Sequence, residues 1–152
     1  MNRFAVAIAS AFGLGYSPIA PGTVGSAAGI LIYFLTSSWS LPAQVLLAAA
    51  VTVVGVWVSS LAARHFGRSD PSHVVIDEVA GQLITLLGTG ATWKGALIGF
   101  LLFRAFDIVK PWPANKLEAL HGGWGIMADD VMAAAYACAI LHGIIWLVPG
   151  MR

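Results

Sequence analysis

The sequence has little cysteine and little charge, and both shortages narrow what the protein can be. One cysteine, Cys138, stands among 152 residues, so neither a disulfide nor a thiolate metal site can form within one chain. Charged residues make up 10% and hydrophobic residues 59%, against about 25% and about 45–50% in ordinary soluble domains. The formal net charge is +1 and no dense run of Lys or Arg occurs, which argues against nucleic acid as a partner. This composition predicts a membrane protein with a single domain over residues 1–152.

Three familiar phosphate-handling motifs are also missing. The Gly/Pro-rich segment GYSPIAPGTVGS at residues 15–26 lacks the GK[ST] ending of a Walker A loop. The chain has no DxDx[TV] aspartyl nucleophile, which ranks an aspartyl-phosphate intermediate below direct attack by water, and no CxxxxxR loop. Because a single cysteine cannot form a thiolate metal site, any metal must use oxygen or imidazole ligands.

Five apolar runs separate the polar motifs, at residues 27–35, 43–63, 79–87, 96–106 and 131–148. Only the second and fifth approach the length of about 20 residues that a span needs. Asp70 and Pro71 predict the N-cap and first residue of a helix that extends the third run from 71 towards 87. The sequence predicts an all-α, polytopic membrane bundle with about four to five membrane-embedded helices, some short. The stretch 4–14 is expected to lie on or partly in the membrane.

The charges test this topology. With the N-terminus in the cytoplasm, the cytoplasmic side holds Arg3, Arg64, Arg68, Arg104, Lys110 and Lys116, and the other side holds Lys94 and Arg152, as the positive-inside rule predicts. The same placement puts all seven carboxylates on or near the cytoplasmic face: Asp70, Asp77, Glu78, Asp107, Glu118, Asp129 and Asp130. Acids in or beside membrane helices are costly, so a group of them at one depth predicts a functional site.

Two of the acidic motifs lie inside predicted helices. Asp77 and Glu78 are flanked by apolar residues and need cations to offset their repulsion. Arg104, Asp107 and Lys110 recur at i, i+3 and i+6, which predicts that they project from one helical face. That face is either a structural ladder of salt bridges or a metal-binding acid between two phosphate-binding cations.

Two further motifs lie at predicted helix starts. Asp129 and Asp130 precede the last apolar run, and we expect one to cap that helix and the other to be free for metal. Thr23 and Ser26 lie in the Gly/Pro-rich loop, where their hydroxyls and the backbone N–H groups are placed to bind phosphate. The hard oxygen ligands of all these motifs favour Mg²⁺ over zinc.

Taken in order, four blocks resemble the signatures of the phosphatidylglycerophosphatase A family: APGTVGS at 20–26, VIDEVAG at 75–81, FLLFRAFDIVKPWP at 100–113 and GGWGIMADD at 122–130. The resemblance covers nearly the whole chain. It implies a Mg²⁺-dependent phosphatase of the bacterial inner membrane that converts phosphatidylglycerophosphate to phosphatidylglycerol. The family's motif acids map onto Asp77, Glu78, Asp107, Asp129 and Asp130, and its polar partners onto Arg104, Lys110, Thr23 and Ser26.

A mechanism follows as a hypothesis. Mg²⁺ would be held by two or more of Asp77, Asp107, Asp129 and Asp130, with Asp107 and Asp130 counted among the catalytic residues. Arg104 and Lys110 would neutralise the phosphate oxygens, and Glu78 would act as general base. The alternative is a divalent-cation or proton transporter, which would place its acids near the membrane midplane. No feature of the sequence specifies an oligomeric state.

Overall fold

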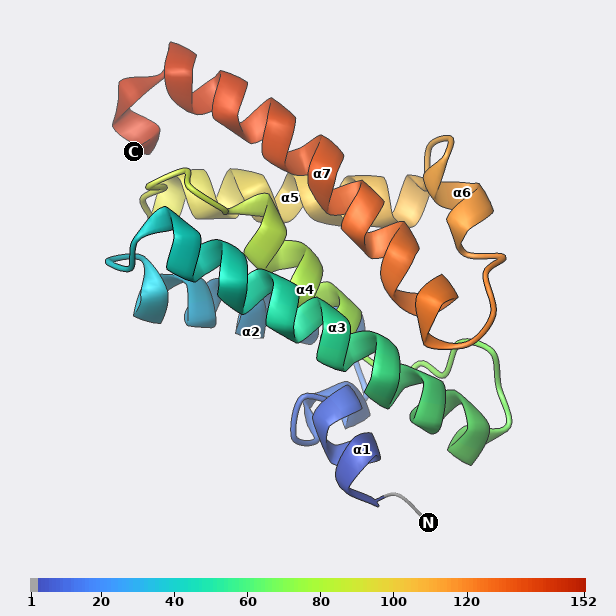
Figure 1. Ribbon diagram of the computed structural model, residues 1–152. Coiled ribbons are helices and arrows are strands. Elements are labelled where there is room, and N and C mark those ends of the chain that lie inside the picture. The colour runs from blue at the N-terminus through green and yellow to red at the C-terminus, as the bar shows by residue number, and fades with distance from the viewer. Residues whose placement is uncertain (1–2) are drawn as a thin grey trace.

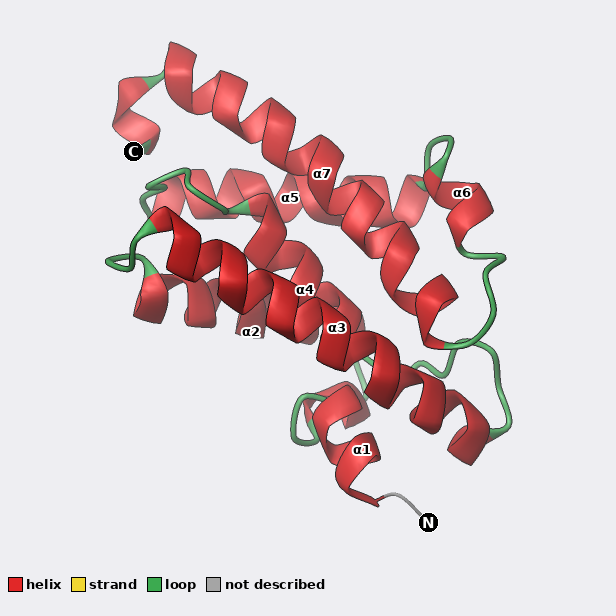
Figure 2. Cartoon of the chain, in the orientation of Figure 1, coloured by secondary structure: helices red, strands yellow, loops and turns green. Residues whose placement is uncertain are grey.

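A computed structural model describes residues 3–152, and every regular element in that range is helical (Figure 1, Figure 2). The all-α prediction is confirmed. The α-helices are α1 (Arg3–Ala9), α2 (Pro21–Thr36), α3 (Leu41–Phe66), α4 (Ile76–Thr85), α5 (Trp93–Val109), α6 (Ala114–Leu117) and α7 (Gly123–Leu147), with 3-10 turns η1 (Leu14–Tyr16) and η2 (Pro149–Met151).

The short helix α4 lies at the centre of the bundle, in contact with α2, α3, α5 and α7 (Figure 1). Helices α2, α4 and α7 run in one direction and α3 and α5 in the other, as their paired contacts along the bundle show. The starts of α2, α4 and α7 therefore lie at the same end as the last turns of α3 and α5. We call this the polar end, because all seven carboxylates belong to these helix termini or to the loops 67–75 and 110–122.

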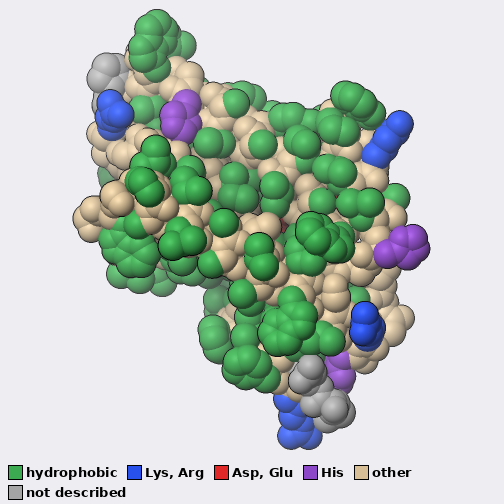
Figure 3. Space-filling view, in the orientation of Figure 1, with side chains coloured by type: hydrophobic (Ala, Val, Ile, Leu, Met, Phe, Trp, Pro, Cys, Tyr) green, Lys and Arg blue, Asp and Glu red, His purple; other side chains and the backbone are tan. Residues whose placement is uncertain are grey.

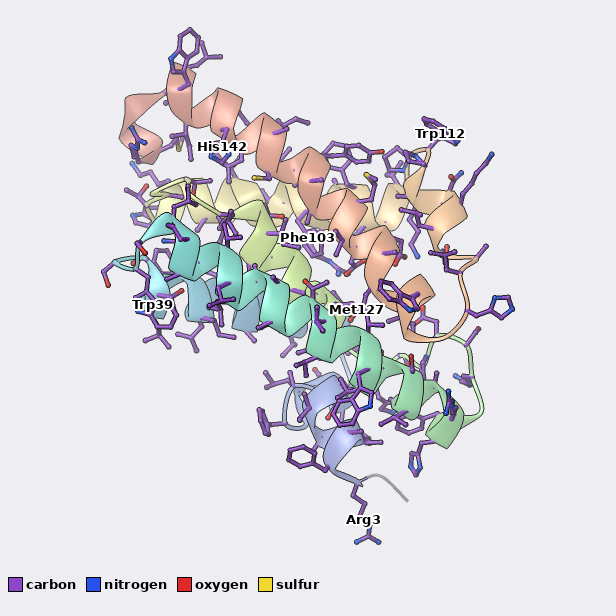
Figure 4. The ribbon with its side chains drawn as sticks, viewed as in Figure 1. Arg3, Trp39, Phe103, Trp112, Met127 and His142 are labelled. Atoms are coloured by element: carbon purple, nitrogen blue, oxygen red, sulfur yellow. The ribbon has the colours of Figure 1, made fainter. Side chains whose placement is uncertain are left out.

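Small residues let the helices approach α4 closely. A Cβ added at Gly29 of α2 would lie 2.7 Å from Gln82 Cβ and 2.9 Å from the Val79 carbonyl oxygen of α4. On the opposite side, Phe103 of α5 is fully buried against Gly81, and Figure 4 shows its ring in the interior of the bundle. These contacts fix the position of α4 and of the acids at its start.

Two helices, α3 with 26 residues and α7 with 25, are long and apolar enough to cross a membrane, while α2 is apolar but shorter. The predicted count of four to five membrane-embedded helices is not confirmed. Large apolar side chains are exposed on the outside of the bundle, including Leu46, Val53 and Trp146 at 71%, 70% and 82%. Figure 3 shows hydrophobic side chains over much of this face, with cationic and histidine side chains mostly near its edges.

The predicted start of the third helix was wrong. Helix α4 begins at Ile76 with Val75 as its N-cap, not at Pro71 with Asp70 as cap. The Val75 N–H donates to the Ala9 carbonyl of α1 at 2.9 Å. The segment before α4 is therefore held by a tertiary hydrogen bond and not by a helical one. Asp70 lies exposed in the preceding loop.

The close contact between α2 and α4 predicts a strong effect of a single methyl group. Gly29→Ala should destabilise the protein by about 1–3 kcal/mol, because the added Cβ overlaps Gln82 and the backbone of α4. The control is Gly143→Ala in α7, where a Cβ would meet nothing within 4 Å and should stabilise by up to about 1 kcal/mol. Thermal unfolding in detergent measures both, and equal melting temperatures would contradict the packing.

Candidate active site

Three carboxylates meet at the polar end of the bundle, and we call them the acid triad. Asp77 and Glu78 come from the first turn of α4, and Asp130 comes from the second turn of α7. Each offers one oxygen, and these three oxygens lie within 4.8 Å of one another. Asp77 is 9% exposed and Asp130 3%. Buried carboxylates at this spacing repel one another unless a cation or protons intervene.

The acid triad has the donor set of a divalent-cation site. Asp77 Oδ1, Glu78 Oε2 and Asp130 Oδ2 are buried and have no hydrogen-bond partner among the described residues. Unpaired carboxylate oxygens are costly to bury, and binding a cation removes that cost. Oxygen ligands alone suit Mg²⁺, so the residues present fit this ion.

Arg104 of α5 joins the acid triad to Asp107. Its Nη1 lies 2.6 Å from Asp107 Oδ2, the predicted i, i+3 pair, and 3.6 Å from Glu78 Oε1. The charge of Asp107 also acts on Asp130, which places Asp107 beside the acid triad. The guanidinium is half-buried and offers its remaining N–H donors to a bound anion.

Lys110 lies at the polar end but not on the predicted face. Helix α5 ends at Val109, and Lys110 adopts a left-handed conformation with φ 45°, so helical spacing no longer sets its direction relative to Arg104 and Asp107. Its Nζ lies 2.7 Å from Asp129 Oδ2 and 3.1 Å from Glu118 Oε1. Burial lowers the pKa of the Lys110 ammonium, but the bonds to these two acids outweigh it and the pKa is raised above its ordinary value. The ion pair of Lys110 with Glu118 was not predicted from the sequence.

The prediction that Asp129 or Asp130 caps the last helix was wrong. Helix α7 begins at Gly123, so both acids lie in its second turn. The Gly123 N–H donates instead to Ser60 Oγ of α3 at 2.8 Å. Because a serine from another helix serves the start of α7, Asp129 is available to Lys110 and Asp130 to the acid triad.

Thr23 and Ser26 also lie within a helix, not in the predicted loop. Helix α2 begins with Pro21 at its first turn, which proline's fixed φ favours. Ser26 is fully buried and its Oγ has no hydrogen-bond partner in the part of the chain that the structure describes, whereas Thr23 is exposed. Gly22, in the first turn of α2, faces the site, because a Cβ there would overlap Glu78 Oε1 and lie 2.9 Å from Arg104 Nη1.

Two buried polar residues inside the bundle were not predicted. Gln82 of α4 and Ser59 of α3 are fully buried, and neither Gln82 amide atom nor Ser59 Oγ has a hydrogen-bond partner among the described residues. Gln82 lies one helical turn below Glu78 and Ser59 in the last third of α3. A polar residue inside an apolar helix was the signal available in the sequence.

Clustered carboxylates beside an arginine and a lysine define a phosphoryl-transfer type of site, here at one end of an all-helical bundle. The sequence profile described as Phosphatidylglycerophosphatase A matches residues 7–145. The chain belongs to the phosphatidylglycerophosphatase A family, and it is a phosphoric monoester hydrolase.

Individual relatives agree with the family. The chain is 37% identical to phosphatidylglycerophosphatase A of Escherichia coli, over 90% of this chain and 81% of the relative. It is 37% identical to the Haemophilus influenzae protein of the same name, over 90% and 86%. It is 39% identical to a candidate phosphatidylinositol-3-phosphatase of Bacteroides thetaiotaomicron, over 94% of both chains. No solved structure matches the chain.

The position of Gly22 predicts a variant that loses activity without unfolding. Gly22→Ala should lower phosphatase kcat by about tenfold to a hundredfold, because the new Cβ displaces the Glu78 carboxylate and the guanidinium of Arg104. The overlapping atoms are flexible side-chain ends, so the melting temperature should stay near that of the parent.

Gly143→Ala, which places a methyl group in open space on α7, serves as the control for the Gly22 variant. It should keep parental activity. Parental kcat in Gly22→Ala would show that the contact with Glu78 and Arg104 does not matter for the reaction.

Proposed function

We propose that the protein hydrolyses phosphatidylglycerophosphate to phosphatidylglycerol and phosphate, with Mg²⁺ bound at the acid triad. The observation that carries the proposal is the meeting of three carboxylates, each with a buried oxygen that has no hydrogen-bond partner among the described residues, while Glu78 also lies 3.6 Å from Arg104 Nη1. Such a site binds a cation together with a phosphate dianion, because the cation and the guanidinium together offset the charges of the acids and the phosphate.

The relatives support this substrate. Two are named for phosphatidylglycerophosphate, and the third for phosphatidylinositol 3-phosphate. Both lipids carry a phosphate monoester on the headgroup of a glycerophospholipid. The family match, which covers residues 7–145, favours the first of them.

The outer surface of the bundle supports the proposed location in the bacterial inner membrane. Only 28% of the most apolar window of α3 and 33% of that of α7 are buried inside the protein, whereas the core helix of a soluble protein is mostly buried. We place these two helices across the membrane, and the polar end at its cytoplasmic face, where six of the eight cationic side chains lie. The acyl chains then stay in the bilayer while the headgroup reaches the acid triad.

The residues divide the work of hydrolysis as follows. Asp77 and Asp130 would hold the metal, which when bound polarises a phosphoryl oxygen and acidifies water. Arg104 and Lys110 exchange an acidic partner for the phosphate oxygens and neutralise them. Glu78 accepts the proton of the attacking water, with Ser26 as the nearest buried hydroxyl on α2.

The remaining acids position the two cations. Asp107 holds Arg104, and Asp129 together with Glu118 holds Lys110. An ion transporter would need acids midway along the membrane helices, and the placement of these acids at helix ends gives that alternative no support.

The assay that tests the function measures phosphate release from phosphatidylglycerophosphate by the purified protein with Mg²⁺. Release should stop with EDTA and fall by about a hundredfold or more in Asp107→Asn, which frees Arg104 from its partner. Lys94→Gln removes an exposed charge at the opposite end of the bundle, so it is the control and should keep most activity. Release that persists unchanged with EDTA and in Asp107→Asn would contradict the metal mechanism.

Binding of Mg²⁺ can be measured without turnover. Saturating Mg²⁺ should raise the melting temperature of the parent, because a ligand at about 100 times its Kd stabilises by about 2.7 kcal/mol. Asp130→Asn, which removes one acid of the triad, should abolish that shift, and in EDTA it should be at least as stable as the parent because like-charge repulsion is reduced. An unchanged Mg²⁺ shift in Asp130→Asn would place the metal elsewhere.

A further inference from the structure

A polar cavity and an apolar groove meet on the flank of α7 that borders α3. The cavity, of about 700 Å³, lies between the last turns of α3 and the start of α7 and is lined by Ser60, Arg64, Arg68, Ser69, His121 and Trp124, among others. The groove, of about 290 Å³, continues between α3, α6 and α7 and is lined by Val56, Leu117, Trp124, Met127, Val131 and Ala135, among others. Trp124 belongs to both, so the two spaces are neighbours.

The cavity is built for an anion. Arg64 and Arg68 line it from α3 and the loop after it, and His121 lines it from the loop before α7. No carboxylate lines it, although all seven acids of the chain lie at this end of the bundle. Basic pockets between membrane helices on the cytoplasmic side are suited to anionic lipid headgroups.

The groove is built for hydrocarbon. Its lining is almost wholly apolar, with Thr52 as the one hydroxyl residue. Met127 forms its floor between α3 and α7, where Figure 4 shows the side chain. The groove runs along the two helices that are long enough to cross a membrane, so in a bilayer it opens to acyl chains.

The cavity and groove lie on a different face of α7 from the acids of the candidate active site. Trp124, Met127 and Val131 recur at helical spacing and face α3 and α6. Asp129 and Asp130 turn towards α5 and α4, where they meet Lys110 and the rest of the acid triad. Met127, 1% exposed, packs against α3, where its thioether lies beside Gly55. A lipid whose chain lies in the groove therefore does not present its headgroup to the acid triad.

We infer that this cavity and groove bind one non-reacting anionic phospholipid. Its headgroup phosphate lies between Arg64 and Arg68, and one acyl chain lies in the groove against Met127 and Val131. The inference rests on the membrane location given under the proposed function, but not on the reaction. Phosphatidylglycerol, the product of the proposed reaction, belongs to this chemical class.

Native mass spectrometry of the full chain in neutral detergent tests the site, with equal excesses of phosphatidylglycerol and phosphatidylcholine of the same acyl chains. The parent should retain phosphatidylglycerol preferentially. Arg64→Gln combined with Arg68→Gln should weaken that retention by roughly thirtyfold, since each cation near the headgroup adds attraction for an anionic lipid. Lys94→Gln combined with Arg152→Gln removes the same charge at the other end and should change little.

A third variant tests the groove. Ala135→Trp fills it from an exposed position, so the protein should fold normally and retain less of both lipids. Equal retention of phosphatidylglycerol by the two charge variants would overturn the anion site, and full retention in Ala135→Trp would overturn the acyl groove.

Kinetics separate this lipid from the substrate. The Arg64/Arg68 variant should keep its KM for phosphatidylglycerophosphate within about threefold of the Lys94/Arg152 variant. A selective rise in KM of tenfold or more would assign the site to the reacting lipid and overturn the inference. Absence of phosphate release by the parent, with phosphatidylglycerol retention intact, would reject the proposed function and leave this site standing.

Discussion

Mutual repulsion of buried carboxylates is the constraint on which the rest of the structure depends. Asp77, Glu78 and Asp130 lie within a few ångströms of one another in a chain whose surface is largely apolar. Burying such charges is unfavourable unless cations offset them. Arg104 on α5 and Lys110 after it supply the protein's own share of that compensation, through Glu78 and through the neighbouring acids Asp107 and Asp129. The unpartnered oxygens that remain are the places where a metal ion would complete it.

The helix packing holds this arrangement in place. Helix α4 is only ten residues long, and glycines on α2 together with Phe103 on α5 fix it from both sides. The same close approach brings Gly22 against Glu78 and Arg104. A helix contact therefore also positions two side chains of the candidate active site. Helix α7 has two different faces. One face carries Asp129 and Asp130, and the other borders the basic cavity and the apolar groove. If both proposals hold, the substrate and the non-reacting lipid meet different surfaces of α7.

Local pattern was sufficient for some elements and misleading for others. The apolar runs predicted where the long helices α3 and α7 lie, and the i, i+3 spacing predicted the pair of Arg104 and Asp107. Helix starts were less predictable, since they depend on hydrogen bonds from distant segments. Ala9 of α1 accepts the bond that stops α4 from extending towards Pro71, and Ser60 of α3 serves the start of α7 in place of an acid.

The sequence by itself determined the helical class, the gathering of acids and cations at one end, and the family. Composition, spacing and motif order act through local chemistry, and they need no knowledge of neighbours in space. Only the tertiary structure decided which acids form the triad, which acids pair with Lys110, and that Gln82 and Ser59 are buried without a hydrogen-bond partner among the described residues. These choices depend on distances of a few ångströms between different helices, which are fixed by packing and not by position along the chain.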